Sequence, residues 1–231
     1  MKITALIRTL NEQEFIGRCC QNHQFCDEIL VADGGSSDDT VRIACGFANV
    51  KVRRFSKKVN LADGSFMNPE PEHMNFLLDW ANETGADWVI MTDCDTWGNR
   101  LLQHHARSIF FKANDIGKSG ILVNQFYLWG TDYYFPKITI DVSQWAFKAD
   151  YGLRYDESKT TFFDSVAPGV DRKECLIINE PYCLLHYVSD EKREPEKVKR
   201  YKAWGKDKTH LLDSIYAPPE PLPQWVKEFQ I

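Results

Sequence analysis

The first hundred residues alternate between short apolar segments and segments of helical periodicity, and this alternation constrains the fold more than any other feature. Four apolar segments have the length of strands: residues 3–9, 27–33, 50–55 and 87–93. The sequence between them predicts helices over residues 11–25, 34–47 and 73–85. Strands separated by helices need crossover connections, so we predict an α/β fold with a mostly parallel sheet and helices on both faces.

Cap and stop signals set the expected helix bounds. Asn11, followed three residues later by Glu14, has the spacing of a capping box. Ser36 or Ser37 can cap the second helix, and Gly85 is typical of the residue that ends the third.

Polar residues follow three of the four predicted strands where each strand ends. They are Thr9, Asn11 and Glu12 after the first strand, Asp33, Gly34 and Gly35 after the second, and Asp93 and Asp95 after the fourth. In open α/β sheets the ligand lies beyond the carboxyl ends of the strands, so we expect these clusters to line one crevice.

Asp93 and Asp95 stand two positions apart, and such residues in a strand face the same way. Carboxylates bind hard cations such as Mg²⁺ at about 2.1 Å, so one direct ligand and one acting through water is the expected arrangement. A dehalogenase-type phosphatase would instead use Asp93 as a nucleophile, but Trp97 stands where that motif has Thr or Val. A third interpretation is that Asp95 caps the helix that starts near Asn99.

After Asn99 the pattern changes. We predict a helix over residues 100–114, antiparallel or mixed strands in the aromatic-rich segment 120–150, and two short strands around Pro181. A charged helix over residues 190–208 and a proline-rich tail follow.

Residues 3–97 carry these motifs in an order and spacing that resemble family 2 glycosyltransferases of the GT-A fold. The quoted segments are "ITALIRTLNEQEFIGRCC", "CDEILVADGGSSDDTV" and "HMNFLLDWANETGADWVIMTDCDT". The resemblance implies a Rossmann-like single domain over residues 1–231. Its parts would be a nucleotide-sugar-binding half (1–97), a mixed, aromatic-rich acceptor half (98–216) and a proline-rich tail (217–231).

The resemblance also implies roles for single residues. Those matching the family's contacts with the nucleotide sugar are Thr9, Asn11, Glu12, Asp33, Gly34, Asn75, Asp93 and Cys94. Asp93 and Asp95 match the motif that holds the diphosphate and Mn²⁺ or Mg²⁺. The sequence departs from the pattern at Gly34, where the family has a second aspartate, and at Met74, where it has an arginine.

His73, Lys57 and Lys58 are candidate replacements for that arginine, although His73 is more typical of a solvated histidine at a helix start. Later in the chain, Asp164 matches the position of the family's catalytic base. His186 is either a histidine at the edge of the core or a third metal ligand, as in several GT-A enzymes.

The resemblance therefore implies a metal-dependent transfer of a sugar from a nucleotide diphosphate sugar, with UDP favoured, to a hydroxyl acceptor with inversion. The acceptor would be a glycan, a lipid-linked or another hydroxyl compound. Residues 192–208 combine basic and aromatic side chains, which suit a solvated helix face, a lid over the donor, or a nucleic-acid acceptor. A non-catalytic binder with this fold is a further alternative.

Three features bear on the compartment. No apolar run approaches the roughly 20 residues that span a bilayer, and the first residues lack the apolar region of a signal peptide. The seven cysteines contain no CxxC pair, which suits reduced thiols. We therefore expect a cytoplasmic protein without a transmembrane segment.

Overall fold

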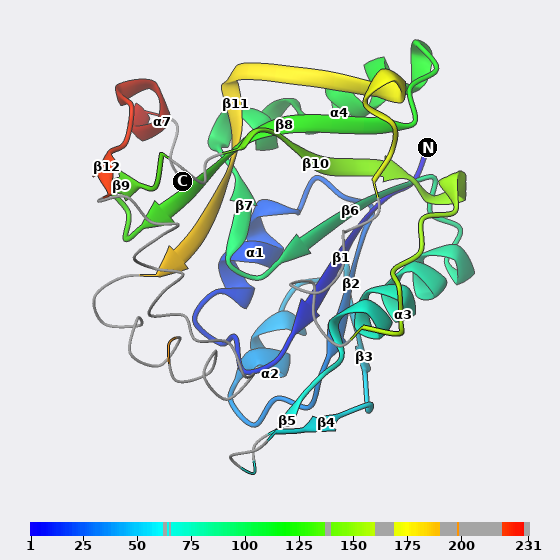
Figure 1. The fold of residues 1–231 in the computed structure, drawn as a ribbon. Helices are drawn as coiled ribbons and strands as arrows, with labels where there is room; N and C mark the ends of the chain where they lie inside the picture. Colours follow the sequence, from blue (N-terminus) through cyan, green and yellow to red (C-terminus); the bar gives the residue numbers. More distant parts are fainter. Residues whose placement is uncertain are drawn as a thin grey trace.

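A computed structural model describes residues 1–61, 64, 66–136, 140–159, 169–189, 198 and 219–228. Within them, one mixed sheet of ten strands crosses the molecule in the order β12-β9-β8-β10-β6-β1-β2-β3, and β11 lies between β7 and β8 (Figure 1). The strands of this sheet are β1 (Ile3–Thr9), β2 (Glu28–Asp33), β3 (Val50–Arg54), β6 (Trp88–Asp93), β7 (Thr96–Gly98), β8 (Gly120–Trp129), β9 (Tyr133–Tyr134), β10 (Ile140–Lys148), β11 (Cys175–Ser189) and β12 (Glu220–Pro221).

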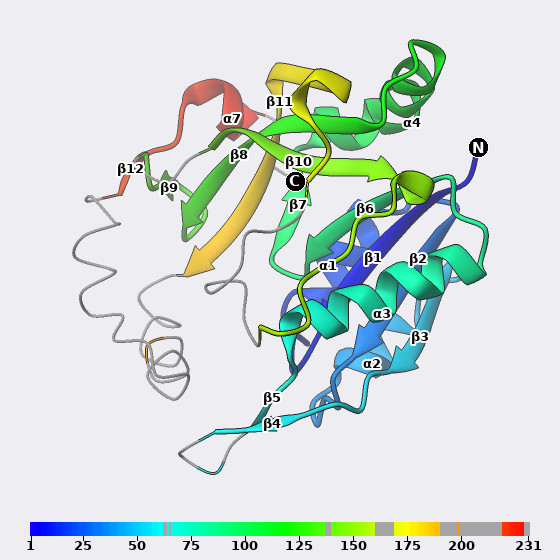
Figure 2. The same cartoon turned by 45° about the vertical axis from the view of Figure 1, so that its right-hand side comes forward.

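Helices cover both faces of the sheet, as predicted. They are α1 (Ile16–Asn22), α2 (Thr40–Ala44), α3 (Glu70–Glu83), α4 (Arg100–Asp115) and α7 (Gln224–Glu228), with short 3₁₀ turns η1 (Ala149–Tyr151) and η3 (Arg172–Glu174). Alternate residues of β1 separate the two faces: Ile3, Ala5 and Ile7 pack in one cluster with α1, α2 and α4, whereas Leu6 packs in another with α3. Figure 2 shows α3 in front of the sheet and α2 behind it.

The four strands predicted in the first half are confirmed. The strands β6, β1, β2 and β3 are neighbours in that order and run parallel. Their carboxyl ends therefore meet at one edge of the sheet.

The second half has the predicted mixed pairing. The strand β10 runs antiparallel to both β6 and β8, whereas β11 runs parallel to β8 and antiparallel to β7. The prediction of two short strands around Pro181 is wrong, because β11 continues through the cis Glu180–Pro181 bond and only its register with β8 shifts there. A small antiparallel hairpin of β4 (Val59–Asn60) and β5 (Phe66–Met67) forms before α3.

Three of the predicted helix caps are wrong. The backbone of Asn11 has a φ of 55°, so the chain turns there and α1 begins only at Ile16. Asp39, not a serine, precedes α2. The cap of α4 is Asn99, whose side-chain oxygen accepts from the backbone N–H of Leu102 at 2.9 Å, which removes the capping interpretation of Asp95.

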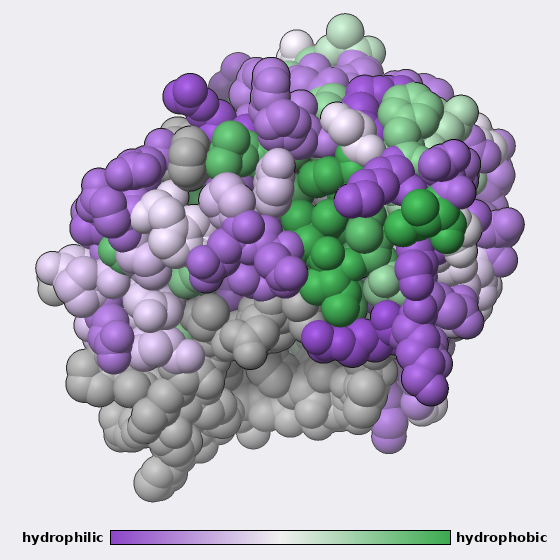
Figure 3. Space-filling model, turned by 90° about the horizontal axis from the view of Figure 1, so that it is seen from above, coloured by the Kyte–Doolittle hydropathy of each residue, from purple (hydrophilic) through white to green (hydrophobic). Residues whose placement is uncertain are grey.

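Apolar side chains are mostly buried in the part of the chain that the structure describes. Seen from above, the coloured part of this face is mostly hydrophilic, with a group of strongly hydrophobic residues near its centre and smaller hydrophobic areas towards its upper edge (Figure 3). In the described part of the chain, the exposed large hydrophobic residues are Met1, Phe111, Ile116 and Tyr133. No described helix has the length and hydrophobicity to cross a membrane.

Candidate functional site

The structure brings the three predicted polar clusters together at one edge of the sheet. Thr9 at the end of β1 pairs with Asp33 at the end of β2. On the other side of β1, Arg8 pairs with Asp93 at the end of β6. The strand ends therefore meet at one edge of the sheet, as the parallel topology predicts, and the crevice that they would line stays a prediction.

Asp33 is fixed by the turn that follows it. Its carboxylate accepts hydrogen bonds from the backbone N–H groups of Gly35 (3.0 Å) and Ser36 (3.1 Å). The loop after β1 is tied to the same turn, because Asn11 accepts from Ser37 N–H at 2.8 Å and its own N–H donates to Ser36 Oγ at 2.8 Å. Through these hydrogen bonds, Asn11 joins the loop after β1 to the turn after β2.

The neighbouring side chain of Asn68 leaves no room for a side chain at position 34. A Cβ atom at position 34 would lie 1.8 Å from Oδ1 of Asn68, so no larger residue fits without a shift. The Asn68 amide donates to the carbonyls of Gly34 (3.3 Å) and Lys57 (2.9 Å). The buried amide of Asn68 thus occupies the space that a side chain at position 34 would need.

Asp93 is paired with a residue that sequence reasoning missed. Nε of Arg8 donates to Asp93 at 2.8 Å, and Nη1 of Arg8 donates to Glu70, the first residue of α3, at 2.6 Å. Burial alone would lower the pKa of Arg8, but the attraction of Asp93 and Glu70 outweighs it and raises the pKa. In the sequence, the one sign of this role is that Arg8 places a positive charge near the end of an apolar strand.

Asp95 lies apart from this pair and faces His186. The chain turns between Asp93 and β7, and the carbonyl of Asp95 accepts from the backbone N–H of Tyr187 at 2.8 Å. The strand β11 then places His186 opposite Thr96, with Nε2 of His186 3.7 Å from Oδ1 of Asp95. Asp93 and Asp95 therefore have different partners.

Of the three predicted metal ligands, Asp95 and His186 face each other, whereas Asp93 is paired with Arg8. Among the described residues, no three His, Cys, Asp or Glu side chains converge as metal ligands. Two ligands about 2.1 Å from one ion lie about 3 Å apart at a right angle, so Asp95 and His186 at 3.7 Å need only a small movement to share a cation. A set of one oxygen and one imidazole nitrogen suits Mn²⁺ better than Mg²⁺.

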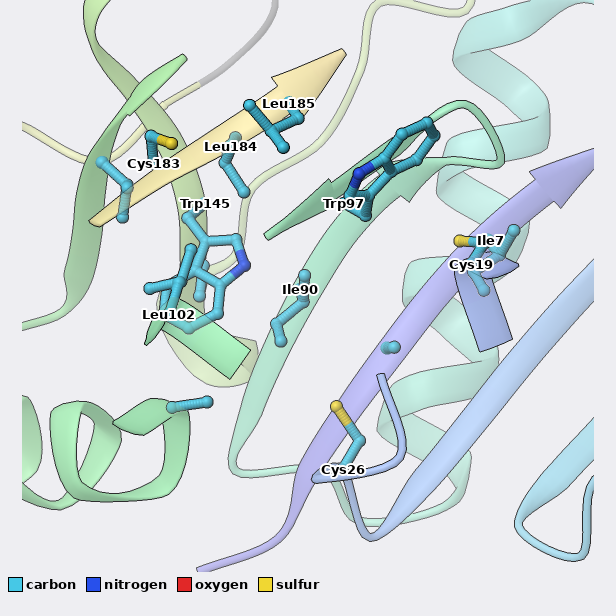
Figure 4. Close-up of a cluster of buried hydrophobic side chains, with 14 of the residues drawn as sticks. Ile7, Cys19, Cys26, Ile90, Trp97, Leu102, Trp145, Cys183, Leu184 and Leu185 are labelled. Atoms are coloured by element: carbon cyan, nitrogen blue, oxygen red, sulfur yellow. The ribbon is translucent and has the colours of Figure 1, made fainter. Parts of the chain in front are cut away.

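The side chain of Cys94 is buried in the core. It is 3% exposed, its thiol lies 3.6 Å from the carbonyl of Arg8, and burial raises its pKa. Trp97 is also in the core, where Figure 4 shows it with Ile7 and Cys19. If Cys94 contacts a ligand, it does so through its backbone.

His73 is not a solvated histidine, so that interpretation is wrong. It is 3% exposed, stacks on Phe55 with ring centroids 4.3 Å apart, and its Nε2 lies 2.9 Å from the carbonyl of Ala32. Burial lowers its pKa to about 4. A neutral, buried His73 is a poor replacement for the missing arginine.

Asn75 is used to hold the chain that follows β10. Its amide donates to the carbonyl of Tyr155 (3.0 Å) and to Glu157 (2.7 Å), and accepts from Tyr155 N–H (2.9 Å). A contact between Asn75 and a donor stays a prediction.

Asp164 lies outside the described residues, and so does almost all of the charged segment 190–208. The catalytic base and the lid remain predictions for that reason.

The comparisons with known proteins show the fold. No protein-family model matches the chain. No curated protein matches it either. It is similar to the structure of S. aureus TarS, with 13% identity, a TM-score of 0.55, and coverage of 92% of this chain and 40% of that one. For the structure of TarS 1-349 the values are 14%, 0.54, 92% and 66%.

The chain thus spans 40% of the length of the first of these structures. At such low identity the likeness shows the fold alone, a GT-A fold with a mostly parallel central sheet. The fold implied by the sequence resemblance is confirmed.

Proposed function

We propose that this chain is a glycosyltransferase that moves a sugar from a nucleotide diphosphate sugar, with UDP as the expected nucleotide, to a hydroxyl acceptor with inversion. The observation that supports it most is the gathering of Asp33, Asp93 and the Asp95–His186 pair at one edge of a GT-A sheet. A glycan or a lipid-linked compound is the expected acceptor.

The donor would lie across the ends of β2, β1 and β6. Asp33 and the turn of Thr9 to Glu12 would hold the nucleobase and ribose. Asp95 and His186 would hold Mn²⁺ or Mg²⁺, which supplies positive charge for the departing diphosphate. Arg8 fixes Asp93 in the same region through its hydrogen bond.

Asp164 is the proposed catalytic base. It would take the proton of the acceptor hydroxyl as the anomeric carbon of the sugar gains positive charge, a contribution of about 10²- to 10⁴-fold.

The phosphatase hypothesis receives less support. It needs Asp93 as a nucleophile, but the carboxylate of Asp93 accepts a hydrogen bond from Arg8 and forms an ion pair with it. Phosphorylation of Asp93 by a phosphate ester, with no response to nucleotide sugars, would favour that hypothesis over ours.

Thermal-shift screening tests the proposal. We expect UDP, GDP or one of their sugars to raise the melting temperature, and Mn²⁺ to increase that shift. Asp95→Ala should abolish the effect of Mn²⁺, whereas Asp164→Ala should keep donor binding and lose transfer. The proposal fails if no nucleotide gives a metal-dependent shift, and the division of roles fails if both variants lose binding equally.

A further inference from the structure

We propose that Gln125 is a positioning residue for His186: its side-chain oxygen accepts a hydrogen bond from Nδ1–H of His186, which leaves Nε2 unprotonated toward Asp95 as a ligand for a divalent cation. This inference rests on the proposed function. It explains how a metal site with few protein ligands is organised before the metal binds.

The sheet fixes where His186 stands. The strand β11 is paired on both sides, so His186 lies opposite Thr96 on β7 and opposite Tyr127 on β8. Gln125 precedes Tyr127 by two positions on β8, and residues at this spacing face the same side of a strand. Gln125 and Tyr127 therefore lie on the side of His186 that β8 borders, and Asp95 adjoins the side that β7 borders.

The orientation of the His186 ring is set by these two neighbours. The ring of Tyr127 stacks on it with centroids 5.0 Å apart and an angle of 28° between the planes. The side chain of Gln125 is only 7% exposed, and its Nε2 is placed 3.3 Å from Nδ1 of His186. With its plane and its Nδ1 both held, the ring directs Nε2 toward Asp95.

The distance to Asp95 indicates which nitrogen of His186 carries the proton. A neutral imidazole has one N–H group. If Nε2 carried it, that nitrogen should donate to Asp95 within about 3.2 Å. The observed distance is 3.7 Å, too long for this bond but within a small movement of the separation of two ligands of one ion.

The proton is therefore assigned to Nδ1, and Gln125 must accept it. As placed, Nε2 of Gln125 faces Nδ1, and a donor there would leave the proton of His186 on Nε2. The proposal therefore assigns the opposite amide orientation, in which a half-turn of the Gln125 side chain puts Oε1 at this position. Histidines that bind metals commonly donate their other N–H in this way, and loss of the acceptor costs about 10- to 100-fold in metal affinity.

The test compares two variants of the full chain by Mn²⁺ affinity, measured by titration calorimetry with UDP present. Gln125→Leu removes the acceptor at similar volume, and we expect Mn²⁺ to bind about 10- to 100-fold more weakly. Gln125→Glu keeps an acceptor oxygen and should bind Mn²⁺ at least as tightly as the wild type. Melting without metal shows whether each variant is folded.

Gln144→Leu is a matched control. Gln144 is a glutamine on β10 that bonds to the carbonyl of Ala146 and the N–H of Val170, so its loss should affect stability and leave Mn²⁺ affinity unchanged. In metal-free protein, ¹⁵N NMR of His186 should show the Nδ1–H form in the wild type and in Gln125→Glu.

The outcomes separate this inference from the proposed function. The role of Gln125 is wrong, and the metal site stands, if the wild type binds Mn²⁺ tightly and Gln125→Leu binds it equally well. The same conclusion follows if Gln125→Glu weakens Mn²⁺ binding as much as Gln125→Leu does. An Nε2–H form in the wild type also overturns it. If the wild type binds no Mn²⁺, the metal dependence and the inference both fall.

Discussion

At the scale of single residues, Arg8 links two elements that meet at the site. It bonds to Asp93 on β6 and to Glu70 on α3, and its own side chain is 21% exposed. Replacement by Met keeps most of the volume and leaves both carboxylates without this cation.

We expect Arg8→Met to lower the free energy of unfolding by about 1–3 kcal/mol, measured by urea denaturation. The estimate is for hydrogen bonds to charged groups, and it is moderate because Asp93 is 40% exposed and partly screened. Arg42→Met is the control, since its pair with Asp39 is largely exposed and its loss should change the free energy of unfolding very little. Equal losses in both variants would contradict the role given to Arg8.

Some residues of the site could be predicted from sequence and others could not. Asp33 and Asp93 follow recognisable strands, so their meeting at one sheet edge follows from the parallel topology. Arg8, Asn68 and Gln125 act through contacts with residues far away in the chain. No local pattern marks such contacts.

At the scale of elements, the turn after β2 packs directly against the residue that follows β5. The amide of Asn68 fills the space beside Gly34 and bonds to its carbonyl. The turn and the β4–β5 hairpin are therefore expected to depend on each other.

A double-mutant cycle tests this dependence. Gly34→Ala should lower the free energy of unfolding by about 1–3 kcal/mol, because the new Cβ would lie 1.8 Å from Asn68 Oδ1. Asn68→Ala alone should lose about 1–2 kcal/mol through its two hydrogen bonds. In the double variant the free energy of unfolding should fall by less than the sum of the two single losses, because the clash is then absent. Additive losses would mean that the clash is relieved elsewhere.

The elements themselves were predicted well where periodicity decides and poorly where loops bond to one another. The helix α3 and its stop at Gly85, which has a φ of 72°, follow from an apolar stripe and a terminal glycine. The start of α1 was misplaced because Asn11 bonds to Ser36 and Ser37 across the loop instead of capping a helix. The strand β7 is only three residues long and has no signal of its own.

At the scale of the whole molecule, two buried histidines make stability depend on pH. His23 and His73 are 2% and 3% exposed, and burial lowers the pKa of each to about 4. In the unfolded chain their pKa is about 6.5, so between pH 4 and 6.5 the unfolded state binds more protons than the folded state. Stability therefore rises with pH across this window and is lost as the pH falls.

We expect the free energy of unfolding to decrease by up to about 1.4 kcal/mol per pH unit for each histidine as the pH falls from 6.5 towards 4. Urea denaturation at several pH values measures this slope. Replacing both His23 and His73 by Gln should flatten it, whereas replacing the exposed His104 by Gln should not. A slope unchanged in the double variant would assign the pH dependence to other groups.

The position of β11 between β7 and β8 has a consequence for the order in which the chain assembles. The strands β1, β2, β3 and β6 all lie within the first 93 residues, so Asp33, Asp93 and Arg8 can meet soon after the first half is synthesised. His186 reaches Asp95 only when a strand from much later in the chain inserts beside β7. A cation held by this pair would recognise the completed chain and not its first half, and its binding would stabilise the last pairing to form.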